Sequence, residues 1–315
     1  MIMKFAELFE EFVKVKGLEV RPSSLSLYRL NWKGLSSLVS EYDISEFGKR
    51  EARFVLASII NEGIQPKTAK DRMAFLKQMI CWAALELEIG VKSTDWGLKF
   101  PKSKPRLLKN FTEPELIRLV AKATSEIYAG NYNILPILIS VLTGMRMGEV
   151  LGLQWKDIDF VHNQISVERQ AAKYYDPEQK KEIMLVAAPK TQAAYRTIPV
   201  IGVLRKVLRF VGGKNPNPDF FVVGNSETPK VHNTIRETYA RFLKRSKLPS
   251  INFHGLRHTY ATRLVESGGD IKTISILLGH TNVATTMNLY VHPSDESKRK
   301  VCNKAFRKLK ESLEI

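Results

Sequence analysis

Residues 143–153, Thr-Gly-Met-Arg-Met-Gly-Glu-Val-Leu-Gly-Leu, predict a glycine turn followed by the first turns of a helix. Arg146 stands at the start of that helix, and Glu149 lies one helical turn further along. In one interpretation the two residues form an ordinary surface ion pair. In the other, Glu149 orients the guanidinium of Arg146, whose planar fork then binds a phosphate through two hydrogen bonds.

A second segment, residues 253–260, reads Phe-His-Gly-Leu-Arg-His-Thr-Tyr and places His254 and Arg257 on one helical face. His254 and His258 also stand four residues apart, a spacing that metal ligands use. No glutamate lies between them, however, and Arg257 would put a fixed positive charge beside any bound cation. The sequence therefore predicts no metal here, and it predicts that His258 is a hydrogen-bonded residue of the core.

Two further features lie in the same part of the chain. Pro189-Lys190-Thr191-Gln192 reads as a turn between two short segments of strand-like character. Gly279-His280 is followed after ten residues by Tyr290 and then by His292. Taken singly, a tyrosine among apolar helical neighbours is usually a core residue, and a histidine after a glycine usually marks a helix end.

The first hundred residues have the apolar spacing of helices. The spacing predicts helices from Phe5 to about Gly17, from Pro22 to Val39, from Ser45 to Asn61 and from Pro66 to about Leu87. Four helices with short connections are typical of a compact all-α unit. We expect this domain to span residues 1–104, with a basic, proline-containing linker near 99–109.

Residues 105–315 have a mixed pattern and are expected to form a second domain. Thr112 and Glu115 form a capping box that predicts its first helix. Alternating apolar residues at 164–169, 183–187 and 196–200 predict a small antiparallel sheet. Helical spacing occurs at 133–142, 233–247, 255–266, 271–278, 283–292 and 297–313. The predicted fold class is therefore mainly α with a small antiparallel β-sheet: an all-α domain followed by an α+β domain.

The charge balance points to a polyanionic partner. The chain has 49 Lys and Arg against 32 Asp and Glu, a formal charge of +17. Such an excess favours nucleic acid, with a merely basic protein as the alternative. The longest apolar stretch, 134–145, contains a proline and a glycine and is too short to cross a bilayer, and no signal peptide is visible. Two distant cysteines favour a reducing, cytoplasmic setting.

Taken in order, these segments resemble the tyrosine recombinase (phage integrase) family of site-specific DNA recombinases. That family has an arginine in a Gly-x-Arg-x-x-Glu context, a lysine in a β-turn, a His-x-x-Arg pair, a Gly-His dipeptide and a nucleophilic tyrosine. The positions that match are Arg146, Lys190, His254, Arg257, His280 and Tyr290. Residues 189–200, with Arg196-Thr197-Ile198-Pro199, are similar to the hairpin that carries the family's lysine. Residues 286–292, Thr-Met-Asn-Leu-Tyr-Val-His, resemble the form found in conjugative-transposon integrases.

The resemblance covers residues 112–292 and implies a catalytic domain over 105–315. The four N-terminal helices are similar to the family's core-binding, SAM-like domain, which contacts DNA. The implied product of cleavage is a 3′-phosphotyrosyl link between DNA and Tyr290, with a free 5′-hydroxyl that later attacks in reverse. Since the ester energy is retained in that link, neither ATP nor a metal nor any other cofactor is expected.

Each matching residue has an implied role in that reaction. A phenol with its ordinary pKa of about 10 is protonated at pH 7, so the tyrosine needs cations around the phosphate. Two arginines, Arg146 and Arg257, would bind the non-bridging oxygens and stabilise the transition state. Two histidines, His254 and His280, would hydrogen-bond the same phosphate, and His254 could accept the tyrosyl proton. Lys190 would protonate the departing 5′-oxygen.

The resemblance also implies partners and a setting. We expect a homotetramer on paired sites of double-stranded DNA, with the C-terminal helix at 297–315 exchanged between protomers. Accessory directionality or DNA-bending proteins are further partners that the family allows, and no membrane is involved. The expected task is integration or excision of a mobile element or prophage on the nucleoid of a bacterial cytoplasm.

Four alternatives remain open from the sequence. The chain could be a DNA-binding relative that has lost turnover, a Xer-like recombinase that resolves chromosome dimers, or a type IB topoisomerase, which shares the chemistry. A metal-dependent transposase would instead use three acids such as Asp157, Asp159 and Glu168. The preferred interpretation of Asp157 and Asp159, however, is that they flank the start of a strand after Trp155.

Overall fold

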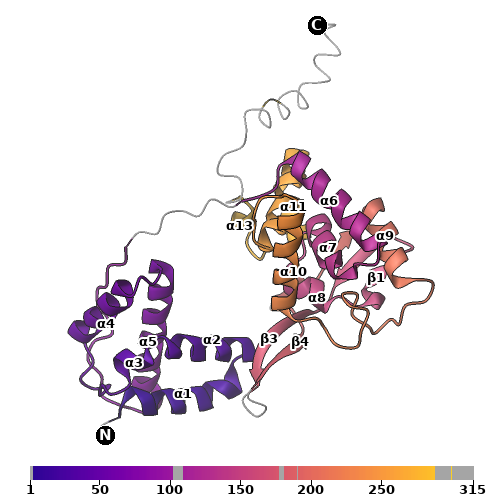
Figure 1. Cartoon of the computed structure of the whole chain (residues 1–315). Coiled ribbons are helices and arrows are strands. Elements are labelled where there is room, and N and C mark those ends of the chain that lie inside the picture. The colour runs from indigo at the N-terminus through magenta and orange to yellow at the C-terminus, as the bar shows by residue number, and fades with distance from the viewer. Residues whose placement is uncertain (1–2, 102–108, 177–180, 190, 288–298, 300–315) are drawn as a thin grey trace. The chain divides into compact units, whose positions relative to one another are not determined.

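A computed structural model describes residues 3–101, 109–176, 181–189, 191–287 and 299 of the 315-residue chain. The chain divides into two compact units, residues 1–106 with 174–183 and residues 107–173 with 184–315. Figure 1 labels the elements of both. Among the described residues, no helix is both long enough and apolar enough to cross a membrane.

Helices form the described part of residues 1–106. They are α1 (Phe5–Glu19), α2 (Pro22–Lys33), α3 (Ser36–Val39), α4 (Lys49–Asn61) and α5 (Pro66–Glu86). Their apolar faces meet in one core, in which the rings of Phe5, Phe12 and Phe47 are fully buried. Burial of such aromatic faces, and not the intrinsic preference of each segment, stabilises helices of this length.

Two of the predicted helix boundaries in this unit were wrong. The helix that begins at Pro22 ends at Lys33 and not at Val39, because the chain turns at Gly34. The guanidinium group of Arg72 packs over Gly34, where a Cβ would lie 2.2 Å from its central carbon. The helix predicted from Ser45 begins at Lys49, since Ser45 is held in a turn by its hydrogen bonds to Asp43.

The second unit is built around α7 (Leu135–Thr143). This helix packs against α6 (Glu113–Tyr128), α8 (Met147–Gly152), α9 (Gly202–Gly212) and α11 (His254–Glu266) (Figure 1). Because it has neighbours on all sides, its residues are apolar around the whole circumference. The predicted capping box is present at the start of α6, where Glu115 accepts a hydrogen bond from the backbone N–H of Thr112.

Three strands form a sheet beside this helical core. They are β1 (Ile158–Asp159), β2 (Gln164–Val167) and β5 (Arg196–Pro199), in the antiparallel order β1-β2-β5. Ile165 lies opposite Ile198, and Val167 lies opposite Arg196. Along β5, residues 196 and 198 are buried whereas 197 and 199 are exposed, so Arg196 shares the core face with Ile198.

The predicted single sheet was wrong in one respect. Residues 183–187 belong to β4 (Lys181–Ala187), which pairs with β3 (Gln170–Asp176) in a separate two-stranded sheet. The sequence analysis predicted neither the strand β3, which contains Tyr174, nor the helix α9. The mainly α fold with small antiparallel sheets is confirmed.

The remaining helices of this unit are α10 (His232–Arg245), α12 (Ile271–Leu278) and α13 (Val283–Met287), with 3₁₀ turns at Tyr132–Ile134, Trp155–Asp157 and Gln192–Ala194. The bounds of α12 agree with the predicted 271–278. The C-terminal helix expected at 297–315, the turn residue Lys190 and the tyrosine Tyr290 lie outside the described residues.

Candidate active site

Gly144 and the helix start that follows it position the first arginine. Gly144 ends α7 in the left-handed conformation, with φ of +69°. A Cβ at this position would lie 2.5 Å from the Cδ1 atom of Tyr260, so the turn needs both the conformation and the small size of glycine. The chain leaves this turn with Arg146 at the N-cap of α8, as the sequence predicts.

Glu149 holds Arg146 in place. Its carboxylate accepts a hydrogen bond from the backbone N–H of Arg146 at 2.8 Å and a second from the Nη1 of Arg146, also at 2.8 Å. The glutamate is buried whereas the arginine is partly exposed. The predicted pair is therefore present, and its geometry is that of a buried carboxylate orienting a guanidinium that still reaches solvent.

Arg257 enters the same region from α11. Its guanidinium is buried and donates from Nη1 to the carbonyl oxygen of Gly144 at 2.8 Å and from Nη2 to that of Leu278 at 2.6 Å. His254 is the first residue of α11, one helical turn before Arg257. The rings of His254 and His258 meet edge to face, with centroids 4.6 Å apart.

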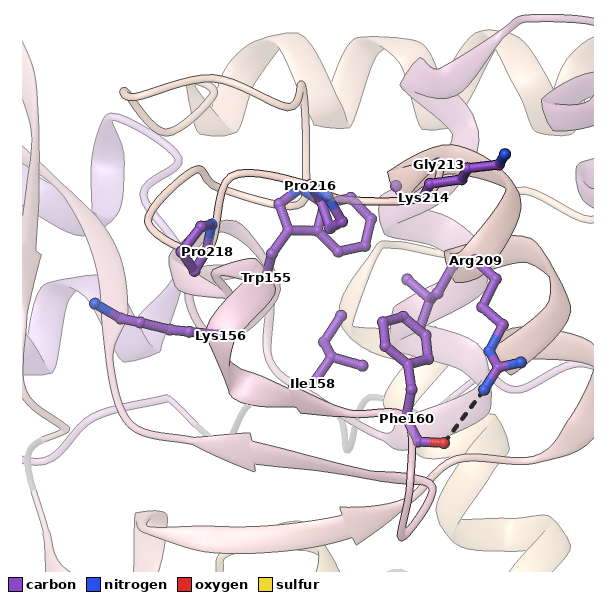
Figure 2. A pocket seen from close by; sticks show the side chains of 11 residues that line it. Trp155, Lys156, Ile158, Phe160, Arg209, Gly213, Lys214, Pro216 and Pro218 are labelled. Atoms are coloured by element: carbon purple, nitrogen blue, oxygen red, sulfur yellow. Dashed lines mark hydrogen bonds between the residues drawn. The ribbon is translucent and has the colours of Figure 1, made fainter.

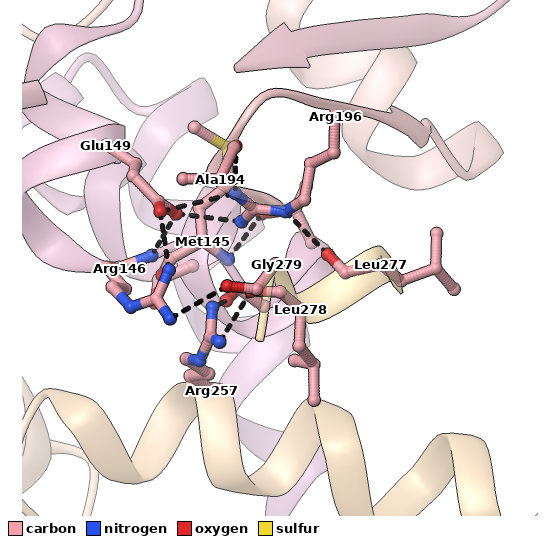
Figure 3. Close-up of polar contacts among 12 residues, drawn as sticks. Met145, Arg146, Glu149, Ala194, Arg196, Arg257, Leu277, Leu278 and Gly279 are labelled. Atoms are coloured by element: carbon pink, nitrogen blue, oxygen red, sulfur yellow. Dashed lines mark hydrogen bonds and ion pairs between the residues drawn. The ribbon is translucent and has the colours of Figure 1, made fainter. Parts of the chain in front are cut away.

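A third arginine, Arg196, was missed as a site residue by the sequence reasoning. Its side chain is buried, and it bonds Glu149 twice, through Nη1 to Oε1 at 3.2 Å and through Nη2 to Oε2 at 2.8 Å. Figure 3 shows the carboxylate of Glu149 between the guanidinium groups of Arg146 and Arg196. The signal available in the sequence was an arginine at a core-facing position of an alternating strand, in register with Ile198 and Val200.

The three arginines meet at the C-terminal end of α12. The carbonyls of Leu277, Leu278 and Gly279 accept hydrogen bonds from Arg196, Arg257 and Arg146 respectively (Figure 3). The two preceding carbonyls are bonded within the chain, since the N–H of Gly279 donates to Ile276 and that of His280 donates to Ser275. Three guanidinium groups thus bind carbonyls at a helix end that would otherwise lack partners. The helix dipole also favours positive charge at this end.

His280 follows directly on this helix end. Gly279 is left-handed, with φ of +65°, and it turns the chain so that the Nδ1 of His280 hydrogen-bonds with the Oγ1 of Thr286 at 2.8 Å. Close to this histidine lies a hollow of about 410 Å³. The hollow is lined by Arg146, Glu149, Gln170, Pro189, Thr191, Ala194, Gly279, His280, Thr281 and Thr285.

The electrostatics of this hollow are strongly positive. Although His254 reaches solvent, partial burial of its ring and the charges of His258, Arg257 and Arg146 lower its pKa to about 4. Partial burial, with Arg257, Arg146 and Arg196, also lowers the pKa of His280 to about 4. Both histidines are therefore neutral at pH 7 in the free protein. An anion entering the hollow would raise both pKa values, because it offsets the cations that lower them.

Glu149 and Arg257 are the two buried charged groups of the site, and different influences set their pKa values. Burial raises the pKa of the Glu149 carboxyl, but the hydrogen bonds and charge of Arg196 and the charge of Arg146 outweigh it, so the net shift is downward. Burial and the neighbouring Arg146 lower the pKa of Arg257 to about 9. At pH 7 the site thus contains one carboxylate and three guanidinium groups, a net positive charge suited to a phosphate.

Four of the six predicted site residues are brought together in this way: Arg146, His254, Arg257 and His280. The other two, Lys190 and Tyr290, lie outside the described residues. The two chain neighbours of Lys190, Pro189 and Thr191, both line the hollow. The prediction that His258 is hydrogen-bonded is not met at Nδ1, which is buried without a hydrogen-bond partner among the described residues.

The acids of the metal-dependent alternative do not converge. Asp157 is buried and paired with Arg169 at 2.5 Å, whereas Asp159 pairs with the exposed ring of His162 at 2.6 Å. Within the ranges that the structure describes, no three His, Cys, Asp or Glu side chains group so that they could hold a metal ion. The two aspartates flank the short 3₁₀ turn and strand after Trp155, which was the structural interpretation of these residues.

A second hollow, of about 440 Å³, lies elsewhere in the same unit (Figure 2). Trp155, Phe160 and Pro216 line it, and none of the predicted site residues does. Arg209, also in its wall, sits over the Phe160 ring and bonds the carbonyl of the same residue at 3.4 Å. Lys156 and Lys214 line this hollow as well, and Figure 2 shows the side chains of Lys156, Arg209 and Lys214 pointing in different directions.

The chain is similar to known proteins in sequence and in fold. The family model described as the phage integrase family matches residues 109–297. A XerC-like tyrosine recombinase of Caldanaerobacter subterraneus subsp. tengcongensis is 30% identical over 257 residues, which are 74% of this chain and 64% of that protein. The ICEBs1 integrase of Bacillus subtilis is 24% identical over 285 residues, 86% of this chain and 74% of that protein. The chain thus spans only 64% of the length of the XerC-like relative, and it spans 48% of the Tn916 transposase of Enterococcus faecalis, another relative.

Solved structures share the fold. The Tn1549 transposon integrase in complex with transposon right end DNA superposes with a TM-score of 0.75 at 20% identity, covering 96% of this chain and 99% of that one. A lambda integrase dimer bound to a COC′ core site gives a TM-score of 0.66 at 19% identity, covering 90% and 97%. With the family model matching more than half of its length, this chain belongs to the phage integrase family.

Proposed function

We propose that the chain is a site-specific DNA recombinase that cleaves and rejoins strands through a covalent link between Tyr290 and a 3′-phosphate. The observation that carries the proposal is the hollow at the end of α12. Arg146 and Arg257 converge there on consecutive carbonyls, beside two neutral histidines. Arg146 and His280 line the hollow, and the buried Arg257 adds its positive charge nearby, which suits a phosphodiester that must gain charge in its transition state.

In the proposed cleavage step, the Tyr290 oxygen attacks phosphorus and the bond to the 5′-oxygen breaks. His254 accepts the tyrosyl proton, which its neutral ring allows at pH 7. Lys190 donates a proton to the 5′-oxygen as it leaves, while Arg146, Arg257 and His280 hold the non-bridging oxygens. In the second step, the 5′-hydroxyl of the partner strand attacks the phosphotyrosyl link and releases Tyr290. One phosphate ester replaces another in each step, so neither ATP nor a metal is required.

The proposal extends to the assembly and its setting. Residues 1–104 would act as the core-binding domain and 105–315 as the catalytic domain, joined by the basic linker near 99–109. Support comes from related proteins: the Tn1549 integrase structure contains transposon DNA, and lambda integrase forms a tetramer on a Holliday junction. By analogy we propose a homotetramer on duplex DNA that exchanges its C-terminal helix, acts in the bacterial cytoplasm and moves a mobile element.

Resolution of chromosome dimers is a second candidate task. It is favoured by the 30% identity to the XerC-like recombinase and by XerC of Actinobacillus succinogenes, 24% identical with 90% of both chains covered. The mobile-element task is favoured by the Tn916 transposase of Enterococcus faecalis, 28% identical over 207 residues, and by the ICEBs1 integrase. The tasks differ in substrate, since dimer resolution uses two identical chromosomal sites and integration joins two different sites.

Covalent trapping on nicked DNA tests the function. Duplexes tiled across the DNA that flanks the gene, together with a library of random core sequences, would carry a nick beside the cleavage position so that the short 5′-hydroxyl fragment diffuses away. The proposal predicts a protein–DNA adduct that survives denaturation, forms equally well in chelator and is absent in Tyr290→Phe. Binding without any adduct would instead assign the non-catalytic role, and chelator-sensitive cleavage would assign a metal-dependent one.

A further inference from the structure

Arg196 is a buried cation that the proposed chemistry does not use. It occupies a core-facing position of β5, where an apolar residue would be expected, and its side chain is only 2% exposed. Burial of an arginine is costly unless every donor finds a partner. Its position therefore needs a reason beyond packing.

The partners of Arg196 come from three separate parts of the site. Nε donates to the carbonyl of Leu277 at 2.7 Å, at the end of α12. Nη1 donates to the carbonyl of Ala194 at 3.0 Å, in the segment that follows Lys190. Both terminal nitrogens reach the carboxylate of Glu149. The Arg196 guanidinium thus links the end of α12, the 3₁₀ turn at Gln192–Ala194 and Glu149, which orients Arg146.

Glu149 transmits this arrangement to Arg146. Its Oε1 accepts from the Nη1 of both arginines, and its Oε2 accepts from Arg196 and from the backbone N–H of Arg146. The plane of the carboxylate is therefore fixed from one side by Arg196 and presented to Arg146 on the other. Without Arg196, the carboxylate could rotate or become protonated, and the Arg146 fork would lose its defined direction.

Gly279 packs closely against Arg196 and the backbone of Ala193. A Cβ placed on Gly279 would lie 3.0 Å from the Nη1 of Arg196 and 3.0 Å from the carbonyl of Ala193. Glycine at 279 thus permits the close approach of β5 to the end of α12. His280 is the next residue in the chain, and its Nδ1 is hydrogen-bonded with the Oγ1 of Thr286.

We propose that Arg196 is a positioning residue of the strand-cleavage site, which sets the direction of Arg146 through Glu149 and fixes the 3₁₀ turn at Gln192–Ala194 relative to the end of α12. This inference rests on the proposed function. Arg196 does not contact DNA in this account, because its side chain is buried and its Nε, Nη1 and Nη2 all donate to groups of the protein. Its loss should accordingly slow cleavage more than it weakens DNA binding.

The test compares Arg196→Met and Arg196→Lys with the wild-type full chain on a nicked duplex that the wild type cleaves. Single-turnover cleavage by Arg196→Met, per folded molecule, should fall by at least about tenfold, the value of one charge-assisted hydrogen bond. The Kd for the duplex should change by less than about threefold. Arg196→Lys retains the positive charge but not the planar guanidinium, so its cleavage rate should lie between those of the wild type and Arg196→Met.

A pH profile separates positioning from stability. The groups that face Glu149 are Arg146 from the start of α8, Arg196 from β5, and Arg257 and His254 from α11. Removing Arg196 removes the strongest of the influences that lower the Glu149 pKa, so the acid limb of the cleavage rate should move to higher pH. In a Glu149→Gln background the same substitution should leave the limb unmoved and lower the rate no further.

A matched control is Arg245→Met, which breaks the ion pair between Arg245 and Glu126 in the same unit but away from the hollow. It should leave both rate and profile unchanged. The inference is overturned if Arg196→Met cleaves at the wild-type rate per folded molecule, if its effect adds independently to that of Glu149→Gln, or if the acid limb stays in place. If the wild type itself cleaves no duplex, the proposed function fails, and the role of Arg196 fails with it.

Discussion

Replacing Glu149 by glutamine removes the charge at the centre of the site while keeping the side chain's shape. The buried carboxylate accepts four hydrogen bonds, two from Arg146 and two from Arg196. Glutamine retains one oxygen and presents an NH₂ group in place of the other, so two donors, one from each arginine, face a second donor. The Arg196 guanidinium is then left buried without a counter-charge.

The size of the effect follows from these contacts. Loss of two hydrogen bonds to a charged partner, at about 1.5–3 kcal/mol each, gives about 3–6 kcal/mol. An independent figure, the cost of breaking a buried ion pair by removing one partner, is about 3–5 kcal/mol. The free energy of unfolding should therefore fall by about 3–5 kcal/mol, which lowers Tm by roughly 6–20 °C for a unit of this size.

Urea unfolding at pH 7 and scanning calorimetry measure this change. The matched control is Glu126→Gln, which weakens the partly exposed pair with Arg245 and should cost about 1 kcal/mol or less. The sign of the pH dependence adds a second check. Since the folded pKa of Glu149 lies below its usual 4.5, its contribution is present above pH 4.5 and is lost as pH falls through the folded value. A loss below about 1 kcal/mol at pH 7 would refute the buried network.

Three further predictions follow from the same site. His254 and His280 should titrate near pH 4 by NMR, and their pKa values should rise when inorganic phosphate or duplex DNA binds. Because their folded pKa values lie below 6.5, the free energy of unfolding should rise with pH between about 4 and 6.5. Titration midpoints near 6.5 in the free protein would contradict the burial described here. Gly144→Ala should lower the free energy of urea unfolding by at least about 2 kcal/mol, because the backbone is left-handed there and a Cβ would meet Tyr260. In the control Gly202→Ala the new Cβ enters open space, so the change should stay within about 0.5 kcal/mol. Equal effects of the two substitutions would be evidence against the turn. The affinity for DNA should fall steeply with salt, with a slope of about 0.9 for each phosphate neutralised, and a flat response would contradict a cationic hollow.

The sequence predicted those parts of the fold that depend on local periodicity. The bounds of α12 were obtained from its apolar spacing and the glycine that ends it, and Arg146 was placed correctly at a helix start by the preceding Gly144. The helix α9 was missed although Leu204, Val207 and Leu208 have helical spacing. The pairing of β4 with β3 was also missed, since strand partners depend on contacts that no local pattern specifies.

The site shows the same division. Arg146, His254, Arg257 and His280 were found by motif, and their convergence required the tertiary fold. Arg196 was not selected, because a lone arginine in a strand reads as an exposed residue until its partners are known. Its burial follows from the register of β5, which places residue 196 on the same face as Ile198.

The identity of the residue that becomes attached to DNA tests the central claim most directly. The adduct trapped on a nicked duplex would be digested with nuclease and protease, and the modified peptide would be sequenced by mass spectrometry. The account predicts a nucleotide joined through its 3′-phosphate to the oxygen of Tyr290. Attachment at any other residue, or a 5′-phosphate linkage, would contradict it.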